Sequence, residues 1–187
     1  YVVDRSENVQ KIQNDSFNTI TPIAFTASSG VDSLYIEWMS GNLYITNEYD
    51  NEIYRVPDSG GAQMTVSVSV TAQGYFTPGE IFKFGASLYV VNTLNKKQAI
   101  KYDQNLSSAE VINFGANIID ACVYGGALQV LSESAVYKTD GALAVLLKWG
   151  DFGEGPGRVF NGKSIAYNTA DGLLYIQDGS TIKKFGE

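Results

Sequence analysis

The stretch Leu43-Tyr44-Ile45-Thr46-Asn47 decides the fold, because variants of it return along the chain at a nearly constant spacing. Each variant holds β-branched or aromatic residues and ends in a short polar residue. The mean interval between copies is about 43 residues, so the chain is built from a repeated unit. The other copies are Leu88-Tyr89-Val90-Val91-Asn92, Leu128-Gln129-Val130-Leu131-Ser132, Leu174-Tyr175-Ile176-Gln177-Asp178 and Tyr1-Val2-Val3-Asp4, which matches from its second position on.

A turn and a further strand are expected after each copy. The terminal polar side chain, such as that of Asn47, can accept a hydrogen bond from the backbone two residues on and so start a turn. The next strand carries a basic residue in the same slot of all five copies, although the chain has only 13 Lys and Arg. We expect these residues to form a ring at one radius, which pairs with nearby carboxylates or receives an acidic partner. The ring consists of Lys11, Arg55, Lys101, Lys138 and Lys184.

The remaining alternating segments complete the repeat. Inner strands are expected within 33–39, 80–84, 117–124 and 163–168, and outer strands within 64–71, 108–114 and 142–149. No stretch shows a helical period over 11 or more residues. A sandwich of two sheets also has many short strands, but it does not predict near-equal intervals with the same turn chemistry. We therefore predict an all-β fold, a β-propeller with four blades of about 43 residues, with five blades as the alternative.

The Leu that begins each copy is interpreted as a core residue between blades. Its recurrence at the same point of each strand is typical of a position that packs against the neighbouring blade rather than one that contacts a ligand. The residues concerned are Leu43, Leu88, Leu128 and Leu174.

The strand count leaves a mismatch, with five hairpins against four inner and four outer strands. If residues 14–187 close the propeller, the last blade takes its outer strand from around 17–26, and residues 1–13 form an extra strand or hairpin without a partner. An unpaired apolar strand is a template for pairing with another chain. We therefore expect residues 1–13 to pair with a neighbouring subunit through Tyr1, Val2, Val3 and Val9 in a fibre or ring; alternatively, the chain is a piece of a longer propeller.

The C-terminal part contains a more specific series of motifs. A Gly-rich run at 149–160 precedes Ser164-Ile165-Ala166-Tyr167, and then come Asp171-Gly172-Leu173-Leu174-Tyr175-Ile176 and Thr181-Ile182-Lys183-Lys184-Phe185. This order resembles the NHL repeat, a β-propeller family that mainly binds proteins, glycans or RNA and has some enzymatic relatives. The Pro that usually begins the family's inner strand is absent before Ser164, and the copies at 85–102 and 125–139 are degenerate.

Composition narrows the functional classes. The net charge of −7 argues against binding to a nucleic-acid backbone, and no apolar stretch approaches the roughly 20 residues that span a bilayer. The chain has no His, which removes Ser-His-Asp and Cys-His nucleophile systems and imidazole metal sites. Glu37 and Asp120 are weak candidates for a divalent cation held by oxygen, although paired or solvated charges are the favoured interpretation.

We therefore predict a non-catalytic module without a cofactor, whose partners are proteins, including copies of itself. The scarcity of Lys and the many Tyr, Ser, Asn and Gly residues favour an extracellular or cell-surface location. A lactonase-like hydrolase using channel carboxylates is the alternative from the enzymes, and a glycan-binding propeller is the third hypothesis.

Overall fold

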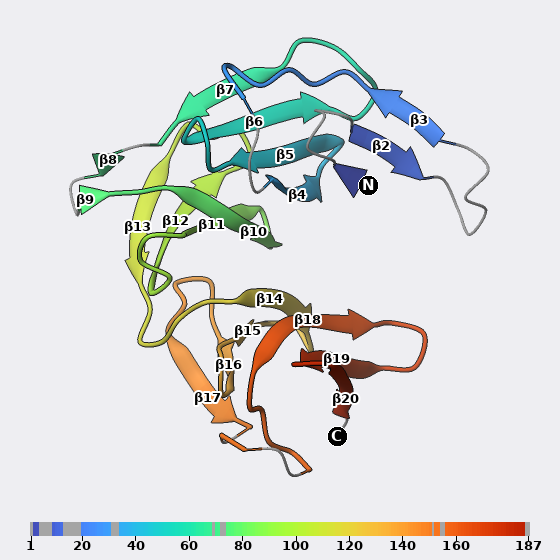
Figure 1. Ribbon diagram of the computed structural model, residues 1–187, viewed down its shortest axis with the longest axis vertical. Coiled ribbons are helices and arrows are strands. Elements are labelled where there is room, and N and C mark those ends of the chain that lie inside the picture. The colour runs from blue at the N-terminus through green and yellow to red at the C-terminus, as the bar shows by residue number, and fades with distance from the viewer. Residues whose placement is uncertain are drawn as a thin grey trace. The chain divides into compact units, whose positions relative to one another are not determined.

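The computed structural model describes residues 2–3, 9–12, 20–30, 34–68, 70–71, 74–150, 152–153 and 156–185, and these form strands and turns with no helix (Figure 1). Each repeat copy contributes to one antiparallel sheet. The first sheet contains β1 (Val2–Val3), β2 (Val9–Ile12) and β3 (Ile20–Ile23). The second contains β4 (Leu34–Met39), β5 (Asn42–Asn47), β6 (Glu52–Pro57) and β7 (Met64–Ser67).

The later copies give two more four-stranded sheets and one three-stranded sheet. The third sheet contains β10 (Pro78–Phe84), β11 (Ser87–Asn92), β12 (Gln98–Asp103) and β13 (Ala109–Asn113). The fourth contains β14 (Asp120–Tyr124), β15 (Ala127–Leu131), β16 (Val136–Thr139) and β17 (Val145–Trp149). The fifth contains β18 (Gly162–Asn168), β19 (Leu173–Asp178) and β20 (Thr181–Phe185), and a separate pair consists of β8 (Val70–Thr71) and β9 (Gly74–Tyr75).

The predicted fold class is confirmed: the chain is an all-β propeller. Within the described residues the strand count also agrees with the sequence, with five hairpins, four inner strands and four outer strands. The inner strands are β4, β10, β14 and β18, and the outer strands are β3, β7, β13 and β17. This is the count from which four blades were predicted.

The N-terminal sheet differs from the expected seam. Ile20–Ile23 pairs with β2, as in the register Val9↔Ile23, and among the described strands the last sheet consists of β18, β19 and β20. β2 therefore has partners along both edges, and the expected boundary between residues 13 and 14 falls within this sheet. Val9 is buried against Phe25 and Leu43, so its side chain serves the protein's own core instead of an exposed strand. Tyr1 and the side chains of Val2, Val3 and Lys11 lie outside the described residues.

Buried polar residues end the four copies whose last residue the structure describes, and they fix the turns. The side-chain oxygens of Asn47 and Asn92 accept hydrogen bonds from the backbone N–H groups of Tyr49 and Leu94, both at 3.1 Å. These contacts two residues on confirm the predicted turn chemistry. The same side chains also reach the loop before the inner strand, since Asn92 accepts from Thr77 N–H at 3.1 Å and donates to the Tyr75 carbonyl at 3.1 Å.

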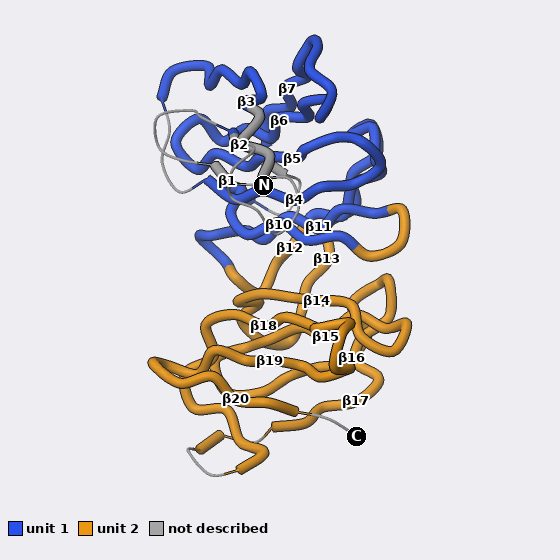
Figure 2. The backbone as a smooth tube through the Cα atoms, turned by 90° about the vertical axis from the view of Figure 1, so that its right-hand side faces the viewer, with its two compact units in different colours: residues 1–83, 87–95, 100–111 blue, residues 84–86, 96–99, 112–187 orange. Residues whose placement is uncertain are grey.

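The structure divides into two compact units (Figure 2). In the first unit, both faces of the second sheet are covered. On one face, Leu43 and Tyr54 pack with Val9 and Phe25. On the other, Tyr44 packs in a cluster with Leu88 and Val90 of the third sheet. The second sheet is thus packed between its neighbours by side chains that alternate along β5.

In the second unit, the fourth and fifth sheets pack in the same manner. Leu131 and Val136 of the fourth sheet share a buried cluster with Leu174 and Ile176 of the fifth. The backbones approach closely at Gly162, where an added Cβ would lie 2.8 Å from the Ser132 carbonyl oxygen.

Replacing Leu88 with Ala should lower the free energy of unfolding by about 2–5 kcal/mol, because it leaves a cavity within the cluster that joins the second and third sheets. Leu94→Ala is the matched control, since that side chain is 69% exposed. Urea unfolding monitored by circular dichroism measures both changes. Equal effects at the two positions would contradict the assignment of Leu88 to the core.

Replacing Asn92 with Ala should lower the free energy of unfolding by about 1–3 kcal/mol, because it removes a buried amide that bonds to part-buried backbone groups of the preceding loop. Asn168→Ala removes a similar turn contact, to Ala170 N–H at 3.0 Å, at an exposed site, and should cost less. Thermal unfolding of the two variants compares them. If Asn168→Ala lowered the stability as much as Asn92→Ala, the hydrogen bonds between the Asn92 side chain and the preceding loop would contribute nothing.

Candidate binding site

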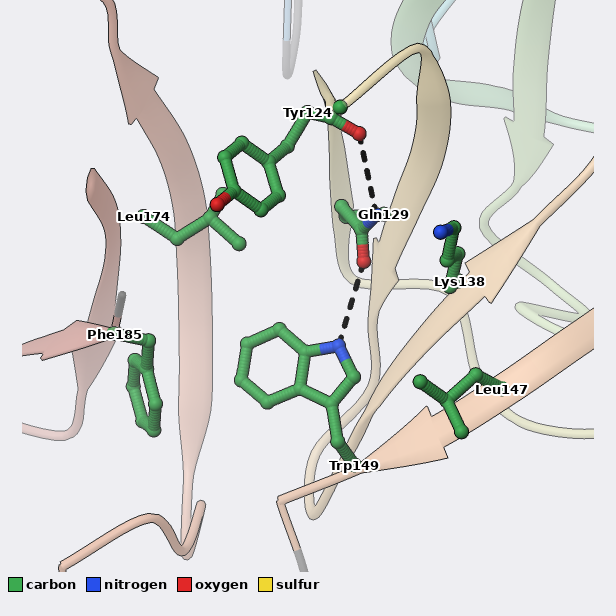
Figure 3. A pocket seen from close by; sticks show the side chains of 8 residues that line it. Tyr124, Gln129, Lys138, Leu147, Trp149, Leu174 and Phe185 are labelled. Carbon is green, nitrogen blue, oxygen red and sulfur yellow. Dashed lines mark hydrogen bonds between the residues drawn. The ribbon is translucent and has the colours of Figure 1, made fainter. Parts of the chain in front are cut away.

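A cavity of about 300 Å³ lies between the fourth and fifth sheets, within the second unit (Figure 3). Small-molecule sites occupy about 300–1,000 Å³, so this cavity is at the lower end of that range. Its opening includes exposed groups, Gly125 and Leu147. The lining residues are Tyr124, Gly125, Gln129, Lys138, Leu147, Trp149, Leu174 and Phe185.

Strand register brings the polar lining together. Gln129 of β15 lies opposite Lys138 of β16, which in turn lies opposite Leu147 of β17. Residues opposite one another in adjacent strands point to the same face of a sheet, so this row faces the fifth sheet. Tyr124 and Trp149, at the ends of β14 and β17, complete the face.

An aromatic wall bounds the cavity. The ring centroids of Trp149 and Phe185 are 5.1 Å apart and their planes are tilted by 56°. The Trp149 indole N–H donates to the Gln129 side-chain oxygen at 3.4 Å, and the Gln129 amide nitrogen donates to the Tyr124 carbonyl at 3.5 Å (Figure 3). Both bonds are longer than the usual 2.9–3.0 Å and are correspondingly weak.

The outer strand of the fourth sheet is a second notable feature. Among the described strands, β17 pairs only with β16 and is the last strand of its sheet (Figure 1). Three consecutive apolar residues on it are exposed: Val145 by 50%, Leu146 by 61% and Leu147 by 56%. Because neighbouring residues of a strand point to opposite faces, apolar side chains are exposed on both faces of this edge.

The five predicted basic residues occupy different surroundings. Arg55 donates to the Asn105 side-chain oxygen at 2.9 Å, and the Lys184 ammonium lies 5.3 Å from the centre of the Tyr175 ring. Lys101 lines a cavity with Asp103 and Glu110. Lys138 lines the cavity beside Gln129, and the side chain of Lys11 is outside the described residues.

The predicted core residues Leu43, Leu88, Leu128 and Leu174 are all buried. Leu43 and Leu88 lie in the clusters of the first unit, and Leu174 lines the cavity in the second.

The two weak metal candidates are occupied by other contacts. Glu37 forms an ion pair with Lys83 at 3.1 Å. Asp120 accepts hydrogen bonds from the backbone N–H groups of Ala121 at 2.7 Å and Ile165 at 2.8 Å, which links the inner strands of the fourth and fifth sheets. No group of three or more acidic or Cys side chains suited to a metal ion occurs in the described part of the chain.

Cys122 lies on β14 opposite Gln129. Burial raises the pKa of its thiol to about 12, and the negative charge of the Asp120 carboxylate adds to the increase. A raised pKa in the folded state gives a stabilisation that is fully present below the thiol's ordinary pKa and is lost as the pH rises from there through the folded-state pKa of about 12.

We therefore expect Cys122 of the folded protein to react slowly with a disulfide reagent such as dithionitrobenzoate at pH 8, because at a pKa of about 12 roughly one thiol in 10,000 is ionised. In 8 M urea the same thiol should react at the rate of an exposed Cys. Equal rates in the two solutions would contradict the raised pKa.

Sequence reasoning missed the cavity and the exposed edge, although two signals point to them. Gln129 occupies the slot that holds Tyr44, Tyr89 and Tyr175 in other copies. The run Val145-Leu146-Leu147 lacks the alternation between apolar and polar residues that a strand with one buried face has.

Comparisons with known proteins agree on the fold. The structure resembles a catalytically inactive virginiamycin B lyase from Staphylococcus aureus bound to quinupristin, with a TM-score of 0.66 and 11% identity over 95% of this chain and 62% of the lyase chain. It also resembles a chain of the nidogen/laminin complex, with a TM-score of 0.65 and 10% identity over 94% of this chain and 68% of the other. The chain is a β-propeller.

A third similar structure is the computationally designed protein Ika4, with a TM-score of 0.56 and 7% identity over 87% of this chain and 95% of that chain. No family model matches the sequence, and no curated protein matches it either. The resemblance to NHL repeats is thus supported at the level of the propeller fold. The described residues contain no helix long and apolar enough to cross a membrane.

Proposed function

We propose that this propeller is a non-catalytic module that binds protein partners, and that β17 is the strand to which a partner is added. In this mode an extended segment pairs with a free sheet edge, main-chain hydrogen bonds supply affinity and alternate side chains supply specificity. The exposed apolar edge of the fourth sheet is the observation on which the proposal rests.

The other outer strands show why β17 is unusual. In β7, exposed Thr65 and Ser67 alternate with half-buried Met64 and Val66. In β13, Glu110 and Asn113 are exposed. These strands place polar groups outside, which protects an edge against unwanted pairing. β17 instead exposes Val145, Leu146 and Leu147. An edge without this protection is the expected form of a docking strand.

Charge identifies the kind of segment that fits. Lys148 is an exposed residue of β17, and Lys138 lies on the adjoining strand, whereas the whole chain carries a net charge of −7. Among the described residues, neither ammonium forms an ion pair with a carboxylate. An extended apolar segment of another protein, with carboxylates beside it, therefore complements this edge better than a basic one.

We also propose the finer features predicted from the sequence, namely an NHL-type repeat and an extracellular or cell-surface location. The repeat motifs support an NHL-type propeller, and the composition supports an extracellular or cell-surface location. The contacts of Glu37 with Lys83 and of Asp120 with backbone N–H groups favour structural roles for these carboxylates over the lactonase-like alternative.

A synthetic peptide, acetyl-Glu-Val-Thr-Val-Thr-Val-Glu-amide, tests the proposed edge. On titration into the ¹⁵N-labelled protein, we expect saturable amide shifts concentrated on β16 and β17. Leu146→Lys should weaken binding at least tenfold, because it places a charge within the apolar strip. Thr65→Lys, at an exposed site of β7, is the matched control and should leave binding unchanged.

A peptide methylated on alternate backbone nitrogens should not bind, because it cannot form the main-chain ladder. Shifts spread over other sheets, or equal binding of the methylated peptide, would overturn the proposal. A dimer seen by analytical ultracentrifugation and abolished by Leu146→Lys would assign the edge to a second copy of the chain and overturn the choice of a separate partner.

A further inference from the structure

The cavity between the fourth and fifth sheets carries a second inference, which rests on a different observation from the exposed edge, although Leu147 and Trp149 of β17 also line the cavity. It arises from one departure from the repeat. In the second sheet, the row corresponding to Gln129 and Lys138 is Tyr44 and Arg55. Tyr44 is fully buried, and its hydroxyl donates to the Gln104 carbonyl in the loop after β12. A phenol ring thus fills the space between the second and third sheets.

The corresponding space in the second unit has no such ring. Gln129 is shorter than Tyr and ends in an amide, and the cavity of about 300 Å³ lies beside it. The walls remain apolar and aromatic, since Leu174, Trp149 and Phe185 are among the lining residues. The shape and lining are therefore those of a site for a ring of about the size that the other repeat supplies from its own chain.

The polar groups of the cavity are available for exchange. The two hydrogen bonds of Gln129 measure 3.4 and 3.5 Å, so a ligand atom could replace either partner at little cost. Lys138 has no carboxylate partner among the described residues and lies in the lining beside Gln129. An ammonium group at the rim of an aromatic cavity favours a ligand with an anionic end.

We propose that this cavity binds a small aromatic carboxylate. The ring lies against Trp149 and Phe185, where aromatic groups prefer offset or tilted contact. The carboxylate is held by the Lys138 ammonium, and the Gln129 amide orients the ligand. Figure 3 shows the side chains that would surround such a ligand.

The probe for the test is 3-(4-hydroxyphenyl)propionate, which resembles the Tyr side chain with a carboxylate attached. The chain has two Trp residues, so a Trp38→Phe background leaves Trp149 as the fluorescent reporter within the cavity. We expect saturable quenching of Trp149 fluorescence by the probe. The neutral 4-ethylphenol should bind more weakly, because it lacks the partner of Lys138.

Single substitutions measure the contribution of each lining residue to binding of the two compounds. Lys138→Met should weaken binding of the carboxylate at least tenfold and change that of 4-ethylphenol less than twofold. Lys148→Met is the matched control on the opposite face of β17 and should leave both unchanged. Gln129→Tyr, which restores the residue of the other repeats, should abolish binding of both compounds by filling the cavity. Trp149→Leu, measured by calorimetry, should also abolish binding.

If the quenching of Trp149 fluorescence did not saturate with the concentration of the probe, the proposed binding site would be overturned. If Lys138→Met and Lys148→Met weakened binding of the carboxylate probe equally, the effect would reflect only the change of net charge. That result would overturn the role of Lys138. Undiminished binding in both Gln129→Tyr and Trp149→Leu would place the compound elsewhere. The peptide titration measures main-chain pairing at the edge of β17, and the small-molecule titration measures occupation of the cavity. Leu147 belongs to both surfaces, but each proposal is judged by its own measurement.

Discussion

The contact on which the architecture depends is the apolar packing of one sheet against the face of the sheet before it. In the first unit, Leu88 and Val90 meet Tyr44 and Ile53. The cross-strand pairing of Tyr44 with Arg55 sets the orientation of the row, because opposite residues share a face. Each repeat cannot bury this face by itself, so its stability comes from its neighbour.

Polar contacts fix the spacing of the same layers. Asn47 and Asn92 are buried, yet their amides satisfy both the turn that follows and the loop that precedes the inner strand. A buried amide without a hydrogen-bond partner has a desolvation cost larger than the net contribution of the hydrogen bond itself. The loops therefore stay within hydrogen-bonding distance of these amides. Apolar packing and buried hydrogen bonds thus specify the same arrangement.

Much of this could be predicted from the sequence. The recurrence of Leu43-Tyr44-Ile45-Thr46-Asn47 predicted the strands, the turns and the all-β propeller, because local turn chemistry and β-propensity agree there. The pairing of Ile20–Ile23 with β2 was not predicted. Alternation identifies a strand but not its partner, and which edge a strand joins depends on contacts distant in sequence.

The candidate sites were missed for a related reason. The copy at 125–139 was recognised as degenerate, but degeneracy alone does not show whether a neighbouring side chain fills the space that a missing ring leaves. In the structure, Gln129 leaves that space open, and Leu146 and Leu147 stay exposed on the adjoining edge. Both features belong to the fourth sheet, where the repeat departs most from its pattern. Departures from local rules are expected where a protein binds.

The central claim is that the residue following the repeat's Leu determines whether the space between two sheets is filled or open. The urea midpoint of Gln129→Tyr tests it most directly, with the wild-type chain as reference. Filling a cavity in the apolar layer should raise the midpoint without changing the slope of the transition. A lower midpoint, with a crystal structure showing the new ring turned to solvent, would contradict this account of how the sheets pack.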